Sequence, residues 1–346
     1  YGTFGGTPYS AFVGDFYFDN TPQDIDLLEH ISHVAASAHA PFLSAIAPGM
    51  LSMNSFSELP YPRDLAKLFE TTDYARWRSF RQIDDSRYVG LTLPQSLGRI
   101  PYGMKTVPAE TFNFEEHISE DNSGKDYLWV NTAFELACRI VDAFEEYGWC
   151  AAIRGVEGGG LVKSLPAYNY TSHTGERLLQ CPTEVAISDR REKELSDLGF
   201  IPLIYCKGTD FAAFFAVQSV NKPRQYNTDQ ANANARLSSQ LQYILATSRF
   251  AHYLKVIVRD KVGSFMSKTE CQTYLQNWIM QYVVASDSAG RDTKARYPLR
   301  EASVEVVEIP GSPGSYRAIA WIKPHFQLEG LSMSLRLVAD LPSSVS

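Results

Sequence analysis

The chain has 346 residues, of which 45% are hydrophobic and 12% aromatic, and its formal net charge is −7. This length and apolar content suffice for two or three folded domains and exclude a disordered or low-complexity protein. There is no run of about 18 apolar residues that could span a membrane, and no signal-peptide pattern. Widely spaced cysteines without a C-x-x-C pair favour reduced thiols in a cytoplasmic protein over disulfides or a zinc site. They are Cys138, Cys150, Cys181, Cys206 and Cys271.

Charge is unevenly distributed along the chain. Residues 228–346 hold 13 Lys and Arg against 10 Asp and Glu, a net charge of +3, so residues 1–227 carry −10. Two interpretations remain open: two differently solvated surfaces, or faces of opposite sign that guide one subunit against another. A small basic excess without an aromatic–basic module argues against nucleic-acid binding.

Hydrophobic periodicity and turn residues divide the first 220 residues into strands and helices, which indicates a layered α/β (α+β) fold. The most apolar stretch, Val34–Leu51, is interpreted as the end of a buried helix and its exit. In chain order we expect strands at Phe12–Phe18, Tyr88–Leu93, Ala151–Arg154, Thr183–Ile187, Phe200–Cys206 and Phe211–Val220, and helices at Pro22–Ala40 with Thr21 or Asn20 as the N-cap, Arg63–Glu70, Asp73–Ile83, Thr132–Tyr147 and Asp189–Gly199.

The helix at Thr132–Tyr147 carries a strong amphipathic pattern. Apolar residues recur there at intervals of three and four, which predicts an apolar face along the helix. This stripe consists of Phe134, Ala137, Cys138, Val141 and Phe144.

The sequence changes character near residue 225, and we expect one domain at 1–225 and a second at 228–346. The second domain begins with a long helix whose apolar stripe runs from Leu237 to Val262. A capping box in front of another apolar stripe then predicts a second helix. A charged loop, Ser286–Arg300, leads to the end of the chain.

Three strands are expected at the end of the chain, at Ala302–Ile309, Tyr316–Phe326 and Leu331–Leu341. The last alternates apolar and polar residues, as a half-buried strand does. Three such strands leave at least one edge of unpaired N–H and C=O groups, which proteins usually cover or share. We therefore predict that an edge is shared between subunits, which is an assembly function. The predicted inter-subunit residues are Leu331, Met333, Leu335, Arg336 and Leu337, with Ala318, Ala320 and Ile322 on the preceding strand.

The glycine-rich segment Gly155–Ser164 superficially resembles a phosphate-binding loop. That motif needs Lys directly after its second glycine. Here Leu161 and Val162 stand in front of Lys163, and Pro166 follows where a helix should run. We interpret the segment as a surface loop without a nucleotide.

Other residue clusters give no catalytic or metal site. His30 and His33 lie three residues apart on an expected helix, but a metal site needs a third ligand, and none is evident. The local signatures of a serine or cysteine nucleophile are missing. The sequence thus predicts no catalytic residue, no metal and no cofactor.

Four segments spread along the chain carry a family resemblance. They are YGTFGGTPY at 1–9, CPTEVAISDRRE at 181–192, SRFAHYLKVIVRDKVG at 248–263 and QLEGLSMSLRLV at 327–338. Together they resemble the large sheath subunit of bacterial type VI secretion systems, the TssC/VipB family. The resemblance covers essentially the whole chain.

This resemblance implies a non-enzymatic building block of a contractile, phage-tail-like sheath. In that family each large subunit pairs with a small one (TssB/VipA), and the pairs and their further copies stack helically around a tube of Hcp protein. Contraction drives the tube and its spike outward from a membrane-anchored baseplate, with the sheath in the cytoplasm. The family's C-terminal strands join strands of neighbouring subunits, which is β-augmentation. A membrane-inserted role is not implied.

Family members also have a further N-terminal region, which pairs with the small subunit and carries the segment recognised by the recycling ATPase ClpV. Because this chain begins at Tyr1 without a methionine, we expect a fragment that lacks this segment. On the long helix, Lys255, Arg259 and Lys261 either meet an acidic tube or subunit surface or form a solvated charged face.

Two alternatives remain beside the type VI sheath. A sheath protein of a phage tail or another contractile particle would surround a tube that is not Hcp. An enzyme with an unrecognised site would show a pocket lined by ionisable groups with perturbed pKa values.

Overall fold

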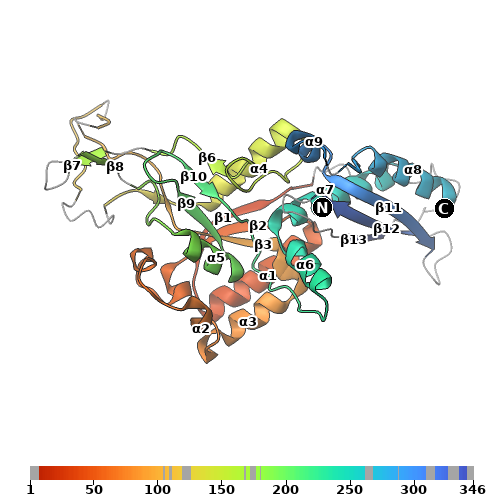
Figure 1. The fold of residues 1–346 in the computed structure, drawn as a ribbon, viewed down its shortest axis with the longest axis horizontal. Coiled ribbons are helices and arrows are strands. Elements are labelled where there is room, and N and C mark those ends of the chain that lie inside the picture. Colours follow the sequence, from red (N-terminus) through yellow and green to blue (C-terminus); the bar gives the residue numbers. More distant parts are fainter. Residues whose placement is uncertain are drawn as a thin grey trace.

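The computed structural model describes residues 8–103, 106–108, 111–118, 126–166, 169–171, 177–179, 181–261, 268–286, 288–308, 316–325 and 335–340. A six-stranded mixed sheet forms the centre of this part of the chain, and a three-stranded antiparallel sheet lies toward one end of the long axis (Figure 1). The expected α/β class is therefore confirmed. Over the described ranges, the helices are too short or too polar to cross a membrane.

The central sheet has the strand order β1-β2-β3-β9-β10-β6. The first four strands of this order are parallel, and β10 runs antiparallel to both of its neighbours. Parallel neighbours need a crossover connection, which helix α1 supplies between β1 and β2. The strands are β1 (Phe12–Phe18), β2 (Phe42–Ile46), β3 (Val89–Leu93), β6 (Leu161–Val162), β9 (Ile201–Tyr205) and β10 (Ala212–Phe214); two small sheets pair β4 (Ser96–Leu97) with β5 (Trp129–Val130) and β7 (Asn169–Thr171) with β8 (Arg177–Leu179).

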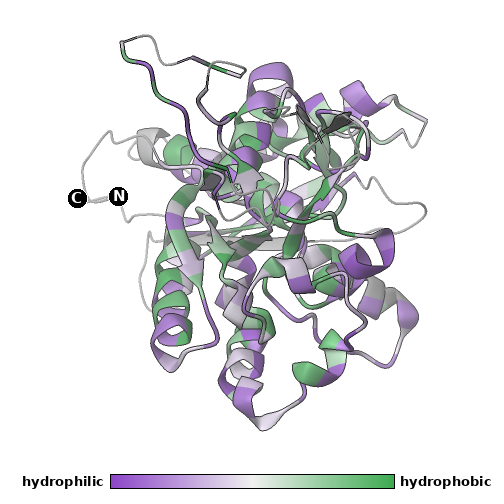
Figure 2. Ribbon diagram, turned by 90° about the vertical axis from the view of Figure 1, so that its left-hand side faces the viewer, coloured by the Kyte–Doolittle hydropathy of each residue, from purple (hydrophilic) through white to green (hydrophobic). Residues whose placement is uncertain are grey.

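Helices cover both faces of the central sheet. Figure 1 places α1, α3 and α5 on one side and α4 on the other, and each side has its own apolar cluster. In Figure 2, helices around the sheet carry both hydrophilic and hydrophobic residues, as expected for amphipathic helices. The elements are α1 (Pro22–Ala38), α2 (Leu65–Leu68), α3 (Ala75–Gln82), α4 (Ala133–Tyr147) and α5 (Asp189–Asp197), with 3-10 turns at Pro48–Leu51, Phe56–Glu58, Thr72–Tyr74 and Asp84–Tyr88.

Several sequence predictions hold to within a few residues, and others are wrong. Helix α1 begins where expected, with the Thr21 hydroxyl accepting the N–H of Asp24 at 3.2 Å. The stretch Val34–Leu51, however, contains strand β2, whose five residues are all buried. A strand buried on both faces shows no alternation, so the pattern resembled a buried helix. Neither Ala151–Arg154 nor Thr183–Ile187 forms a strand.

The predicted long helix of the second half is two helices. The Ser239 carbonyl accepts the N–H of Ser219 at 3.0 Å, and the Leu241 N–H donates to the Val217 carbonyl at 3.0 Å. These bonds to another segment replace the helical ladder and separate α6 from α7. The supposed loop before the terminal strands also contains a short helix. The elements are α6 (Asp229–Ser238), α7 (Leu241–Lys261), α8 (Lys268–Met280), α9 (Arg291–Arg296), β11 (Leu299–Glu308), β12 (Tyr316–Pro324) and β13 (Leu335–Asp340).

Helix α4 lies where the sequence predicts it, and its buried face is not the predicted apolar stripe. Its buried residues are Ala133, Leu136, Ile140 and Ala143, which pack toward the central sheet. The stripe expected from the sequence lies mostly on the exposed side of the helix.

Trp149, which follows α4, belongs to the core of the C-terminal half. Its ring stacks on Phe250 of α7 with 4.2 Å between centroids and meets Tyr282 edge-on at 5.1 Å. Only 4% of its surface is exposed. The two halves of the chain therefore share packing through this side chain.

Candidate assembly interface

The C-terminal sheet has the order β11-β12-β13, so β12 is central and the other two strands have one outer edge each. Both pairs are antiparallel. The register places Glu301 opposite Lys323, and the Lys323 ammonium donates to the Glu301 carboxylate at 2.9 Å. This hydrogen bond lowers the pKa of Glu301 below its usual value. The sheet is thus held in one register by a cross-strand ion pair as well as by its backbone.

One face of this sheet is packed against α7 and α8. Leu254 of α7, Leu275 of α8 and Val306 of β11 belong to one buried cluster with side chains of β12. The β12 members are Ala318, Ala320 and Ile322, which the sequence assigned to an inter-subunit surface. All three are at most 3% exposed and pack within their own chain, so their part in an interface stays a prediction.

The outer edge of β11 is covered by α8. The Gln276 side chain accepts the N–H of Val304 at 2.7 Å and donates to the carbonyl of Ala302 at 3.3 Å, and Gln272 accepts the N–H of Val306 at 3.4 Å. These two glutamines, one helical turn apart, occupy backbone groups that would otherwise recruit another strand. Sequence reasoning missed both of them, and their spacing of four was the one available signal.

The hydrogen bonds of β11 determine to which side the backbone N–H and C=O groups of β12 and β13 point. In an antiparallel strand the N–H and C=O of one residue point to the same side, and successive residues alternate. The N–H of Val304 points outward, to α8. The backbone N–H and C=O of its register partner Ala320 therefore point toward β13, where Ala320 pairs with Leu337. The backbone groups on the outer edge of β13 are therefore those of Arg336, Val338 and Asp340.

Part of the predicted inter-subunit strand lies in β13. Leu335 and Leu337 are the register partners of Ile322 and Ala320, and Arg336 is the partner of Trp321. Leu331 and Met333 lie outside the described residues. Over the described ranges, β13 is the edge of its sheet with no strand paired beyond it.

The three basic residues predicted as a charged interface all belong to α7. Lys255 lies close enough to His39 for its charge to lower the pKa of that imidazole, which places Lys255 beside the C-terminus of α1. Nothing beyond their place in the helix is described for Arg259 and Lys261. Their role as an interface stays a prediction.

A loss of stability is expected when Gln276 is replaced by leucine. The change leaves the Val304 N–H and Ala302 carbonyl without their partner at a helix-covered edge, which costs about 1 to 3 kcal/mol. Urea unfolding of the purified protein measures this difference. Asn277→Leu, at an exposed position of the same helix, is the matched control and should change stability little. Equal unfolding curves for the two variants would contradict the role given to Gln276.

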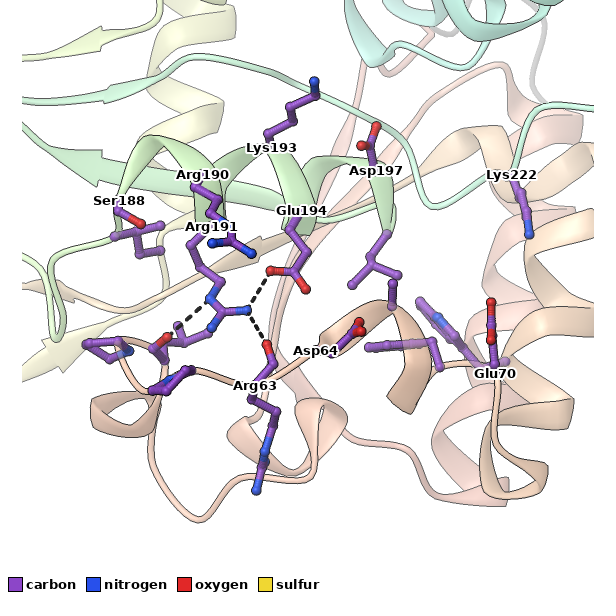
Figure 3. A pocket seen from close by; sticks show the side chains of 18 of the residues that line it. Arg63, Asp64, Glu70, Ser188, Arg190, Arg191, Lys193, Glu194, Asp197 and Lys222 are labelled. Atoms are coloured by element: carbon purple, nitrogen blue, oxygen red, sulfur yellow. Dashed lines mark hydrogen bonds and ion pairs between the residues drawn. The ribbon is translucent and has the colours of Figure 1, made fainter.

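A cavity of about 1060 Å³ lies between the loop before α2 and helix α5 (Figure 3). Its central charged group is Arg191. The guanidinium donates to the carbonyls of Leu59, Tyr61 and Arg63 at 3.2, 2.9 and 2.9 Å, and it pairs with Glu194 at 2.5 Å. These bonds use Arg191 to fasten the loop to the helix.

Two other arginines around this cavity also donate hydrogen bonds to backbone carbonyls. Arg81, 6% exposed, donates to the carbonyls of Val220 and Asp197 at 2.8 and 3.2 Å, and burial lowers its pKa to about 10. Arg78 donates to the carbonyl of Phe69 at 2.8 Å. In Figure 3 the Lys193 side chain points away from the Arg191–Glu194 pair. Arg78, Arg81 and Arg191 thus hold segments of the chain together through backbone carbonyls.

The histidines considered as metal ligands have protein partners. His33 Nδ1 lies 2.7 Å from a carboxylate oxygen of Asp85, and His30 Nδ1 lies 2.7 Å from the carbonyl of Asp26. Over the ranges that the structure describes, no three His, Cys, Asp or Glu side chains are grouped as a metal ion requires.

Two family models match this chain, and both describe tail sheath proteins. Residues 1–221 match the family model described as EvpB/VC_A0108, tail sheath N-terminal domain, and residues 230–341 match that described as EvpB/VC_A0108, tail sheath gpW/gp25-like domain. These are descriptions of tail sheath proteins.

The chain belongs to this EvpB/VC_A0108 (VipB) family of tail sheath proteins. It is 52% identical over 345 residues to the type VI secretion system sheath protein TssC1 of Pseudomonas aeruginosa, covering 99% of this chain and 69% of that protein. The resemblance to the type VI large sheath subunit is thereby confirmed.

A solved structure is also similar in outline. It is a chain from a cryo-EM structure of the anti-feeding prophage baseplate, with a TM-score of 0.41 and 10% sequence identity. The match covers 95% of this chain and 64% of the length of that chain. A likeness at this level adds nothing to the family assignment.

Proposed function

We propose that this chain is a non-enzymatic subunit of the contractile sheath of a type VI secretion system. It pairs with a small sheath subunit, polymerises helically with further copies around an Hcp tube, and contracts to deliver the tube and spike. The identity of 52% to a type VI sheath protein supports this system over a phage tail. The sheath assembles in the cytoplasm on a membrane-anchored baseplate, and a recycling ATPase acts on it.

The observation that carries the assembly role is the difference between the two edges of the C-terminal sheet. On β11, Gln272 and Gln276 occupy the outward backbone groups, whereas β13 is the outer strand on the opposite side. We infer that a strand of a neighbouring subunit pairs with β13 and completes the sheet. Backbone hydrogen bonds give such a joint its strength, and alternate side chains give its register.

The absence of catalysis is part of the proposal. Two charged side chains at the cavity beside α5, Arg81 and Arg191, bind backbone carbonyls, and Arg191 also pairs with Glu194. The family assignment to sheath proteins points the same way.

Electron microscopy of negatively stained samples tests the proposal directly. The full-length protein is co-expressed with its small partner, either intact, without residues 331–346, or without residues 341–346 only. We expect tubules from the first and third samples and isolated subunit pairs from the second, because only the second lacks β13. Tubules in all three would exclude β13 as the joint, and no tubules in any would overturn the sheath function.

A further inference from the structure

Helix α4 is apolar on two neighbouring faces. Leu136, Ile140 and Ala143 pack toward the central sheet. On the outward face Phe134, Val141 and Phe144 are exposed by 46%, 62% and 42%. We call the outward residues Phe134, Ala137, Cys138, Val141 and Phe144 the α4 stripe.

The α4 stripe is continuous along the helix. Phe134, Cys138 and Val141 follow one another at intervals of four and three, which places them on one line along the helix surface. A solvated helix is normally polar on this side. Helix α5 shows the normal arrangement, because of its nine residues only Leu195 is buried and seven are charged.

The charge that α4 itself carries is mostly negative. The helix contains four acidic residues against Arg139, which pairs with Asp142 at 2.8 Å and donates to the Leu161 carbonyl at 3.0 Å. Glu145 and Glu146, at the C-terminal end of the stripe, are exposed. A partner with Lys or Arg beside an apolar strip would match both the shape and the sign of this surface.

A cation already sits at one end of the α4 stripe. The Arg249 guanidinium of α7 lies 5.6 Å from the centroid of the Phe144 ring. A guanidinium over an aromatic face is attracted by the ring quadrupole. This contact shows, within the chain itself, that the rim of the stripe accommodates a basic side chain.

We propose that the α4 stripe docks an amphipathic helix of a neighbouring sheath subunit, a helix whose apolar side is bordered by Lys or Arg. The proposal rests on the assembly role given above and adds a second joint, on a different element from β13. In Figure 1, α4 lies on the opposite side of the central sheet from α1 and α3, at the outside of the molecule, where a neighbour can reach it.

Cys138, an exposed free thiol in the middle of the α4 stripe, reports on this contact in the wild-type protein. Maleimide labelling followed by mass spectrometry compares the isolated full-length protein with purified tubules. We expect Cys138 to react at least about tenfold more slowly in tubules, with the buried Cys150 and Cys271 as internal references.

Two outcomes of this labelling would overturn the proposal. Tubules in which Cys138 reacts as fast as in the isolated protein would exclude the contact and leave the sheath function intact. Protection that appears in the isolated protein as its concentration rises would assign the stripe to a dimer of two copies of this chain.

Substitutions test the apolar part of the contact. Val141→Asp is expected to leave the isolated protein folded, because the side chain is exposed, and to reduce the fraction of subunits in tubules at least about tenfold. Val34→Asp on α1, at a position 65% exposed, is the matched control and should assemble normally. Equal assembly of the two variants would overturn the proposal.

Charge reversal tests the chemistry of the partner. The double variant Glu145→Lys/Glu146→Lys should assemble less well at low salt, with the difference shrinking at high salt because exposed charges are screened. Assembly unchanged or improved by the reversal would show that the docked helix is not basic, and would overturn that part of the proposal.

Discussion

Replacing Val338 by proline is expected to abolish tubules while leaving the isolated subunit folded. The backbone groups of Val338 face the outer edge of β13, and proline removes the N–H that a neighbouring strand needs. Proline is tolerated on an edge strand when its missing N–H faces outward. The fraction of subunits that sediment as tubules with the small partner should fall at least about tenfold, and thermal unfolding of the isolated protein should shift by only a few degrees.

Two further substitutions make this experiment specific. Val338→Ala keeps the N–H and should assemble normally. Leu337→Pro removes an N–H that faces β12, so it should destabilise the isolated subunit. If Val338→Pro formed normal tubules, no strand would pair with β13, and if it unfolded as Leu337→Pro does, the assignment of the outer edge would be wrong.

Stability is expected to fall as the pH drops from about 6.5 to 4, because of two histidines between α1 and α7. His252 Nε2 donates to the Ala38 carbonyl at 2.9 Å, and its ring lies 6.1 Å from that of His39. Burial, followed by the charges of Lys255 and His252, lowers the pKa of His39 to about 4. Burial lowers the pKa of His252 as well.

The sign follows from proton linkage. The unfolded chain takes up a proton on each imidazole at higher pH than the folded chain does, so folding is favoured in full above about pH 6.5 and loses this contribution as pH falls toward 4. A shift of this size corresponds to about 3 kcal/mol at most for His39, and to about 1 to 2 kcal/mol once its partial solvent exposure is considered.

Urea unfolding at pH 7.0 and 4.5 measures the effect. His39 adopts a left-handed backbone conformation with φ of 49°, which asparagine tolerates, so His39→Asn removes the titration and keeps the end of α1. This variant should lose less stability between the two pH values than the wild type. His30→Asn, at an exposed position, is the control. Identical pH dependence of wild type and His39→Asn would exclude His39 as the cause.

Regular elements with a clear period were predictable from the sequence. Strand β1 matches its predicted bounds, and α1 and α4 begin within one residue of theirs. Strand β2 was not predictable, because burial on both faces removes the alternation that marks a strand. The stripe on α4 was detected correctly as apolar, but a helix with two apolar sides gives no signal for which side is covered.

The edge that we propose for assembly was predictable only in part. Alternation in the terminal strand indicated a half-buried strand, and the family resemblance indicated a sharing partner. Which edge is open depends on Gln272 and Gln276 folding back over β11, a contact between residues about 30 positions apart. Two glutamines on a helix surface are common in any sequence, so their contact with β11 could be recognised only in the structure.

Trp149 has a mechanical consequence for a subunit that bears load. A pull on the C-terminal sheet reaches the central sheet through the covalent joint between β10 and α6 and through side-chain contacts, among them the aromatic stack of Trp149 on Phe250. Separating this stack exposes a large aromatic surface in a single step, so the stack resists small displacements and then gives way at once. The subunit should therefore transmit small displacements stiffly between its halves and yield abruptly at a threshold force.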